Sequence, residues 1–117
     1  MNLRGIHHVS INVTNLERAR EFYVDILGLD ELERPELGFP GLWLKAGAQE
    51  VHLLAIDSER PLKEQHFAFD VTDVEAVQQA LVAADVMVSA PSEIAGICRQ
   101  AFTRDPSGNL IEFNQRL

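Results

Sequence analysis

Apolar and polar residues alternate from Ile6 to Val13, which is the pattern of a strand with one buried face. One face carries His7, Val9, Ile11 and Val13, and the other carries Ile6, His8, Ser10 and Asn12. Apolar residues then recur at helical spacing at Leu16, Ala19, Phe22, Tyr23, Ile26 and Leu27. The chain therefore begins with a strand and continues into an amphipathic helix.

Both ends of this helix carry local signals. The run from Thr14 to Glu17 matches a capping box, in which the Thr14 hydroxyl and the Glu17 carboxylate accept hydrogen bonds from free amides of the first turn. Gly28 is the expected residue just beyond the last turn. Short strands are then predicted near residues 31–34, 41–45 and 50–56, with a turn at 46–49.

The second half of the chain repeats the first with a shift of 58 residues. Matching pairs are His8 with His66, Val13 with Val71, Thr14 with Thr72 and Glu17 with Glu75. A second capping box begins at Thr72, and an apolar stripe follows at Val74, Val77, Leu81 and Ala84. Strands are predicted near residues 86–89, 99–104 and 109–115, with a strong turn at 105–108. Each half is therefore predicted to fold as βαβββ.

The predicted fold is α+β, built from two βαβββ modules within one domain of 117 residues. Residues 1–57 form the first module and residues 65–117 the second. Residues 58–64 are polar, contain Pro61, and are predicted to be a linker. Because half of such a short chain buries little apolar surface alone, the modules must pair, within one chain or between chains.

Composition narrows the functional classes. Apolar residues make up 46% of the chain, charged residues 24%, and the formal net charge is −8. This acidity argues against nucleic acid as a partner, since phosphate binding requires a positive patch. No apolar run approaches the roughly 20 residues that span a bilayer, and the first residues lack a secretory signal. We expect a cytoplasmic protein that does not bind membranes, with its single cysteine, Cys98, as a small buried residue and not a nucleophile.

Four side chains at repeat-related positions are candidate metal ligands. They are His8 and His66 on the first strand of each half, and His52 and Glu112 on the last. The separation from 52 to 112 is 60 residues, and we expect the longer turn at 105–108 to absorb the difference from 58. Imidazoles and a carboxylate suit a divalent first-row metal, such as Zn, Ni, Co, Mn or Fe. If both sheets curve toward each other, the four could meet around one ion with positions open to substrate.

Other polar and aromatic residues have two interpretations. Ser10, Asn12 and Asn114 share strand faces with the candidate ligands, and either orient them or are ordinary strand residues. Trp43 either lines the site or belongs to the core. His7 has the opposite parity from His8 and is expected in the core or at the surface. Arg99 and Arg104 are expected at a solvated strand edge, although they could also contact an anionic substrate.

Three segments together resemble the vicinal oxygen chelate superfamily, and the resemblance covers nearly the whole chain. They are Ile6-His7-His8-Val9-Ser10-Ile11, Phe22-Tyr23 with Ile26-Leu27-Gly28-Leu29, and Arg104-Asp105-Pro106-Ser107-Gly108-Asn109-Leu110-Ile111-Glu112-Phe113. The superfamily includes glyoxalase I, extradiol dioxygenases, methylmalonyl-CoA epimerase, fosfomycin resistance enzymes and bleomycin resistance proteins. The pattern is typical of the superfamily and does not single out one of its reactions.

The resemblance implies sheets that form a U-shaped, partly open barrel-like cleft around one divalent metal ion. His8, His66 and Glu112 match the usual ligand positions. His52 stands at the fourth position, where glyoxalase I has Glu and the epimerases have Gln. By resemblance, Glu112 is also the catalytic base.

The implied function is a metal-dependent lyase or isomerase acting on a small oxygen-rich substrate through an enediolate-type intermediate. One alternative is a small extradiol-type dioxygenase using His8, His66 and Glu112. Another is a bleomycin-resistance-like ligand-binding protein, which the acidic composition suits. The resemblance also implies a homodimer, because superfamily modules often pair across chains.

Overall fold

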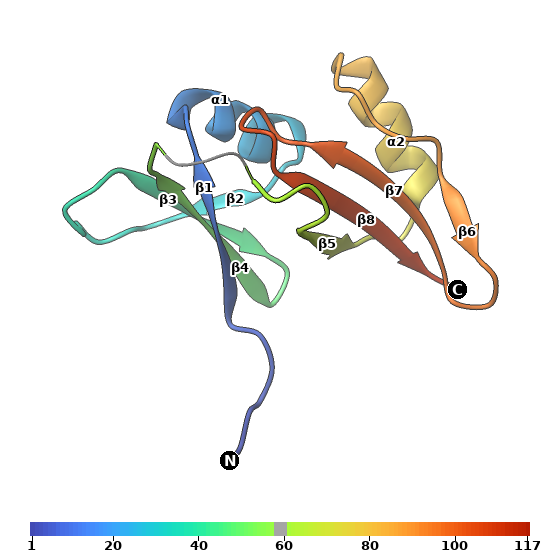
Figure 1. The fold of residues 1–117 in the computed structure, drawn as a ribbon, viewed down its shortest axis with the longest axis horizontal. Helices are drawn as coiled ribbons and strands as arrows, with labels where there is room; N and C mark the ends of the chain where they lie inside the picture. The colour runs from blue at the N-terminus through green and yellow to red at the C-terminus, as the bar shows by residue number, and fades with distance from the viewer. Residues whose placement is uncertain (58–60) are drawn as a thin grey trace. The chain divides into compact units, whose positions relative to one another are not determined.

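The computed structural model describes residues 1–57 and 61–117, and the chain divides into two compact units, Met1–Glu59 and Arg60–Leu117. Each unit contains one four-stranded sheet (Figure 1). The α+β class and the two βαβββ modules predicted from the sequence are confirmed. Of the predicted linker, residues 58–60 lie outside the described residues.

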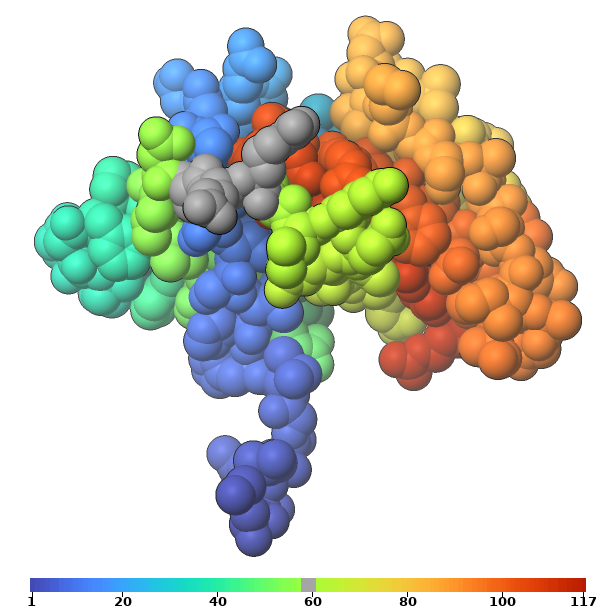
Figure 2. Space-filling view, viewed as in Figure 1, coloured from blue at the N-terminus to red at the C-terminus, as the bar shows by residue number. Residues whose placement is uncertain are grey.

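The first unit is ordered β1-β4-β3-β2 across its sheet. Its elements are β1 (His8–Val13), α1 (Leu16–Arg20), the π-helix η1 (Glu21–Ile26), β2 (Asp30–Leu32), β3 (Gly41–Ala46) and β4 (Gln49–Ala55). Strand β1 pairs in parallel with β4, and the other pairs are antiparallel. Residues before β1 form an extended segment in which Met1, Leu3 and Ile6 are exposed (Figure 2).

The second unit repeats this topology in the order β5-β8-β7-β6. Its elements are β5 (His66–Asp70), α2 (Val74–Ala83), β6 (Ser92–Ile94), β7 (Cys98–Arg104) and β8 (Leu110–Arg116). Strand β5 pairs in parallel with β8, as β1 does with β4. No helix within the described residues is long and apolar enough to cross a membrane.

Both helices begin one residue later than the capping-box prediction. The caps are Asn15 and Asp73, whose side chains accept hydrogen bonds from the amides of Arg18 and Ala76 at 3.0 and 3.1 Å. Thr14 and Thr72 were therefore the wrong cap residues. Asn and Asp are at least as effective as Thr at this position, so the motif alone does not distinguish adjacent candidates.

The end of the first helix has π geometry. The amide of Leu27 donates to the carbonyl oxygen of Phe22 at 2.9 Å, five residues earlier, and Gly28 follows with φ of 79°. Gly28 thus occupies the predicted position after the last turn, where a left-handed conformation favours glycine. The wider turn coincides with burial of Phe22 and Tyr23, which are 3% and 0% exposed.

The strand predicted at 86–89 is wrong, because β6 forms at Ser92–Ile94. Residues 88 and 89 still contact β7: Val88 forms an isolated bridge with Thr103, and the Ser89 hydroxyl accepts from the amide of Phe102 at 2.8 Å. Pro91 lies between this contact and β6 and has no amide hydrogen to continue a ladder. Residues 88 and 89 therefore contact β7 without forming a strand, and regular pairing with β7 begins after the proline.

Each sheet buries one face and leaves the other for polar and aromatic side chains. On the buried face lie Val51 and Leu53 of β4 and Ile111 and Phe113 of β8, none more than 3% exposed. Cys98 is buried at 4% exposure, which confirms its prediction as a buried residue. The opposite surfaces, here called the open faces, carry His52 and Glu112 on those same strands.

The register shows that His52 and Glu112 are equivalent. Ser10 pairs with His52, and Ala68 pairs with Glu112. In the first unit, His8 therefore stands two residues before Ser10, the partner of His52. In the second unit, His66 stands two residues before Ala68, the partner of Glu112. His52 and Glu112 are also two of the few buried polar side chains, at 7% and 8% exposure. The same framework thus holds an imidazole in one unit and a carboxylate in the other at corresponding positions.

The second module has two more residues between its candidate ligands than the first module has. The sequence predicted that the turn at 105–108 accounts for both, but the structure places only one of them there. Trp43 pairs with His52 nine positions later, whereas Phe102 pairs with Glu112 ten positions later, so this turn accounts for one. The other lies earlier, because position 43 follows position 8 by 35 residues and position 102 follows position 66 by 36. The later insertion is held by local bonds of Asp105.

Asp105 is 4% exposed and organises the turn before β8. Its Oδ1 accepts from the amides of Ser107 at 2.9 Å and Asn109 at 2.8 Å, and its Oδ2 accepts from the Asn109 side chain at 2.8 Å. Gly108 adopts φ of 88°. The conspicuous 105–109 motif therefore shapes the entry to the strand that carries Glu112.

Candidate metal-binding site

Three aromatic rings stack across neighbouring strands on the open face of the first unit. The ring of His52 lies 4.0 Å from that of His8, with 15° between their planes, and 4.5 Å from that of Trp43, with 9° between planes. His52 is the middle ring, which explains how an imidazole is buried without entering the core. Trp43 lies on the open face and not in the core. Of the two predictions made for it, this placement fits a residue that lines the candidate site and not a core residue.

This stack restricts how His8 and His52 can bind a metal. The lone pair of an imidazole nitrogen lies in the plane of its ring, and metal–nitrogen distances are about 2.0–2.1 Å for zinc. Two nearly parallel rings 4.0 Å apart cannot both contain one ion in their planes. In the arrangement described, His8 and His52 therefore do not direct lone pairs at a common point.

Glu50 fixes the orientation of the His52 ring. Nε2 of His52 lies 2.8 Å from Oε1 of Glu50, and because a carboxylate only accepts, Nε2 carries the hydrogen. This bond is the main reason that the pKa of Glu50 lies below its ordinary value, with the nearby charges of His52, His7 and His8 acting in the same direction and desolvation opposing them. Only Nδ1 of His52 is then left as a lone-pair donor.

The surroundings of His8 favour its neutral form. Desolvation lowers its pKa from the ordinary 6.5, the charges of His52 and His7 lower it further, and Glu50 opposes them. Nδ1 of His8 also lies 2.8 Å from Nδ1 of His7, so one ring donates to the other. His7 is exposed, one of the two alternatives expected for it. A neutral imidazole is the form that binds a metal ion, so His8 suits that role near neutral pH.

The second unit brings His66 and Glu112 together. Nε2 of His66 lies 3.3 Å from Oε1 of Glu112. Nδ1 of His66 lies 2.9 Å from the backbone carbonyl oxygen of Glu64, which can only accept, so Nδ1 carries a hydrogen. In neutral His66 the Nε2 lone pair faces the Glu112 carboxylate. Two acceptors at this distance are stabilised by a cation between or beside them, either a proton or a metal ion.

Asn114 orients the carboxylate of Glu112. Its side-chain Nδ2 donates to Oε2 of Glu112 at 2.8 Å, which leaves Oε1 facing His66. Asn114 stands two residues after Glu112 on the same strand face, as the alternation predicted. The bond supports the orienting role considered for Asn114 in the sequence analysis. Ser10 and Asn12 are exposed on the open face of the first unit.

Phe102 is the counterpart of Trp43, since each pairs with the second candidate ligand of its unit. Its ring is 5.7 Å from that of His66, with 77° between planes, an edge-to-face contact and not a stack. His66 is therefore free of the parallel-ring constraint that applies to His8 and His52. Its Nε2 remains directed at Glu112.

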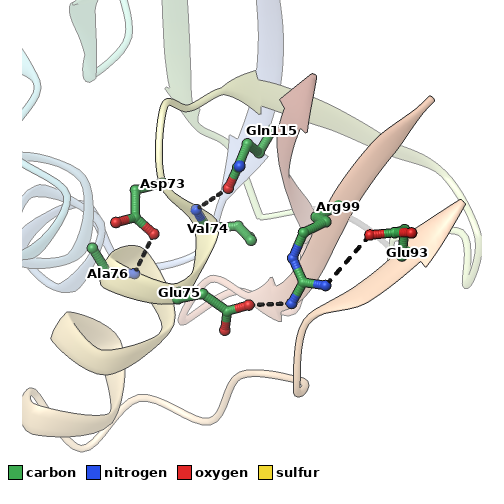
Figure 3. A network of polar contacts seen from close by, with 7 residues as sticks. All are labelled: Asp73, Val74, Glu75, Ala76, Glu93, Arg99 and Gln115. Atoms are coloured by element: carbon green, nitrogen blue, oxygen red, sulfur yellow. Dashed lines mark hydrogen bonds and ion pairs between the residues drawn. The ribbon is translucent and has the colours of Figure 1, made fainter. Parts of the chain in front are cut away.

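Arg99 lies on the face of the second sheet that packs against α2. It forms ion pairs with Glu75 of α2 and, at 3.7 Å, with Glu93 of β6 (Figure 3). The same figure shows Gln115 accepting from the amide of Val74 at 2.9 Å. Arg99 thus points away from Glu112 and its charge is already paired.

The guanidinium of Arg104 forms hydrogen bonds with backbone carbonyl oxygens. It donates to the carbonyl oxygens of Gly108 at 3.0 Å and Lys63 at 3.3 Å. These bonds attach the residues before β5 to the β7–β8 turn. Neither Arg99 nor Arg104 is therefore placed for the anionic-substrate role that the sequence left open.

The structure thus places the four candidate ligands in two pairs, His8 with His52 and His66 with Glu112. Within residues 1–57 and 61–117, it contains no group of three or more His, Cys, Asp or Glu side chains that could hold a metal ion. Glu50, which controls the His52 ring, was not among the residues predicted from the sequence. Its position two residues before His52 on the same strand face was the available signal.

Two βαβββ units with His and Glu at equivalent open-face positions define a protein of the vicinal oxygen chelate class. A family comparison agrees: the Glyoxalase/Bleomycin resistance protein/Dioxygenase superfamily model matches residues 5–113. The chain belongs to this superfamily, which confirms the resemblance identified from its sequence.

Individual relatives extend over nearly the whole chain. Glyoxylase I 4 of Arabidopsis thaliana is 30% identical over 96% of this chain and 71% of its own length. The crystal structure of a Bacillus anthracis protein assigned to the glyoxalase family has a TM-score of 0.90 and 30% identity, covering 100% of this chain and 98% of that one. TnmS3, an antibiotic binding protein from Streptomyces sp. CB03234, has a TM-score of 0.85 and 27% identity, covering 100% and 99%.

Proposed function

We propose that this protein is a metal-dependent enzyme that acts as a lyase or isomerase on a small oxygen-rich substrate. The observation that carries the proposal is the His66–Glu112 pair, in which Nε2 and Oε1 face each other at 3.3 Å while hydrogen bonds hold the far side of each group. Membership of the glyoxalase superfamily and the similarity to Glyoxylase I 4 support an enzymatic role.

The proposed ligands are His66, Glu112 and His8, with His52 at the fourth position. Each is a donor that divalent first-row metals accept, and Zn, Ni, Co, Mn and Fe are all compatible with the set. His52 would have to leave its stack before binding the same ion as His8. A bound divalent ion would polarise a substrate carbonyl as a Lewis acid.

Within this proposal the chain's own residues handle the proton. Glu112 accepts a proton from the carbon next to the substrate carbonyl and returns it to a neighbouring atom. The hydrogen bond from Asn114 to Oε2 keeps the carboxylate oriented during this transfer. Burial of Glu112 at 8% exposure limits competing exchange with water.

Metal content and proton exchange test this proposal separately. Untagged protein is stripped with chelator, reloaded in turn with each of the five metals, and analysed for bound metal. Substituting His66→Ala or Glu112→Ala should lower metal content at least about tenfold, whereas Glu75→Gln, on the opposite face of the same unit, should not. Unchanged content in both ligand variants would refute the assignment.

Catalysis is tested by deuterium incorporation in heavy water. The probes are hydroxyacetone and the hemithioacetals that α-ketoaldehydes form with thiols. Loaded wild-type protein should catalyse exchange at the carbon beside the carbonyl, and Glu112→Gln should lower the rate by at least about 100-fold. Metal binding without exchange of any probe would argue against the lyase or isomerase class while leaving the metal site intact.

A ligand-binding protein is the second candidate. The Trp43–His52–His8 stack presents aromatic surface, and one structurally similar relative is an antibiotic binding protein. This alternative predicts tight binding of a planar organic compound by metal-free protein. Chelator-treated protein that binds bleomycin with an affinity unaffected by Glu112→Ala would favour it.

Oligomeric state is part of the proposal. We expect a homodimer that binds a small molecule, and light scattering at micromolar concentration measures its mass. A mass of 13.1 kDa, that of one chain, would contradict the dimer.

A further inference from the structure

Arg34, in the segment between β2 and β3, is a cation without a charged partner among the described residues. Its Nε is buried and makes no hydrogen bond there. Leaving such a donor unsatisfied costs about 1–3 kcal/mol. A buried donor of this kind in a native structure calls for an explanation, and here it marks a guanidinium that its surroundings fix without pairing its charge.

The side chain of Arg34 is held in place by two neighbours. Its guanidinium carbon lies 4.9 Å from the centre of the Phe39 ring, a cation–π contact. A Cβ atom on Gly41 would lie 2.4 Å from the backbone oxygen of Leu53, 3.0 Å from Nη2 of Arg34 and 3.1 Å from the guanidinium carbon. The close approach of β4 therefore excludes a side chain at Gly41, and the guanidinium lies against the bare backbone there.

Alternation along β3 places this guanidinium on the open face of the first unit. Gly41 and Trp43 share one strand face, opposite the buried Leu42 and Leu44. Trp43 pairs with His52. Arg34 therefore lies on the same side of the sheet as the ring stack that contains His8 and His52.

We propose that Arg34 binds a carboxylate group of the substrate. A guanidinium forms paired hydrogen bonds with a planar carboxylate, and unlike Nε the two Nη atoms are not among the buried, unsatisfied atoms. The chain's net charge of −8 disfavours a dianion such as phosphate relative to a monoanion. The substrate class is thus narrowed to small oxygen-rich carboxylates.

This inference rests on the proposed function only in assigning the carboxylate to the substrate. Binding of an anion by Arg34 involves the first unit alone and does not require metal. The two proposals can therefore fail independently.

The test uses NMR on full-length, chelator-treated protein. The buried Nε–H of Arg34 gives a guanidinium N–H signal, assigned by its loss in Arg34→Lys. Sodium lactate is titrated at constant ionic strength, with inorganic phosphate and sodium chloride as separate arms. The Arg34 signal should shift to saturation with lactate, and the apparent affinity should be about tenfold weaker for phosphate.

Two variants complete the test. Arg34→Lys keeps the positive charge but loses the paired N–H donors of the guanidinium. It should weaken lactate binding about tenfold, measured from backbone signals of β3. Arg18→Lys, at an exposed position of α1, should leave lactate binding unchanged. Metal content should be equal in wild type and both variants.

The contrary outcomes are distinct. No saturable shift with lactate, or equal lactate binding in Arg34→Lys, overturns the proposal. Tighter binding of phosphate than of lactate overturns the carboxylate assignment. Loss of metal content in the Arg34→Lys variant would show that Arg34 supports the metal site and not an anion.

Discussion

Nε2 of His66 lies 3.3 Å from Oε1 of Glu112, while Nδ1 of the same ring donates to the carbonyl oxygen of Glu64. If this pair binds metal, Zn²⁺ should attach at Nε2 and leave the hydrogen on Nδ1. Nitrogen-15 NMR of the imidazole should show a large Zn²⁺-dependent shift of Nε2 only. A Zn²⁺-dependent loss of the Nδ1 hydrogen would contradict this arrangement.

The hydrogen bond from Asn114 to Glu112 predicts an indirect effect on metal affinity. Asn114→Ala should weaken Zn²⁺ binding by about 10-fold or more, because the carboxylate loses the group that orients it. Calorimetric titration measures this change. Gln100→Ala is a matched control, since Gln100 pairs with Asn114 across the sheet. Equal Zn²⁺ affinity in wild type and the Asn114 variant would contradict the proposal that Asn114 orients the Glu112 carboxylate for metal binding.

The contact between Trp43 and His52 is accessible by fluorescence, because Trp43 is the only tryptophan. His52→Ala should expose one face of the indole to water and shift its emission to longer wavelength. Loss of the ring contact should also lower the free energy of unfolding by about 1 kcal/mol. His8→Ala removes the outer ring, which stacks on the other side of His52, and should leave the emission nearly unchanged. Equal emission spectra in the wild type and the His52 variant would argue against the stack.

The local bonds of Asp105 predict a large effect on stability. Asp105→Ala leaves the amides of Ser107 and Asn109 without the acceptor that Asp105 provides in a partly buried turn, and should lower the free energy of unfolding by about 3 kcal/mol. Asp105→Asn keeps one acceptor oxygen and should cost less. Urea unfolding measures both variants. Equal losses in the two would indicate that the buried negative charge matters, and not the acceptor geometry.

The two-module architecture and all strands except β6 were predictable because periodic burial dictates them. Val51 and Leu53 must face the core, so His52 between them must face away. The same logic placed Glu112 correctly between Ile111 and Phe113. The sequence repeat then related His52 to Glu112, and the strand register bears this out.

Side-chain orientation was beyond the sequence because it depends on contacts between strands. Alternation put His8 and His52 on one face, but Glu50 and Trp43 determine the plane of the His52 ring. Arg34 gave no sequence signal either, since its placement requires both the bare backbone of Gly41 and the ring of Phe39. Likewise Asn15 and Thr14 are both good helix caps, and only tertiary geometry selects between them.

The shared register of the two sheets has an evolutionary consequence. A duplicated framework lets each half change its side chains while its backbone pairing stays the same. Here one half carries stacked aromatic rings and a guanidinium over a phenyl ring, and the other an imidazole facing a carboxylate. In such a framework, substitutions on the open face of one half can change the ligand it accepts while the backbone pairing of both halves stays the same.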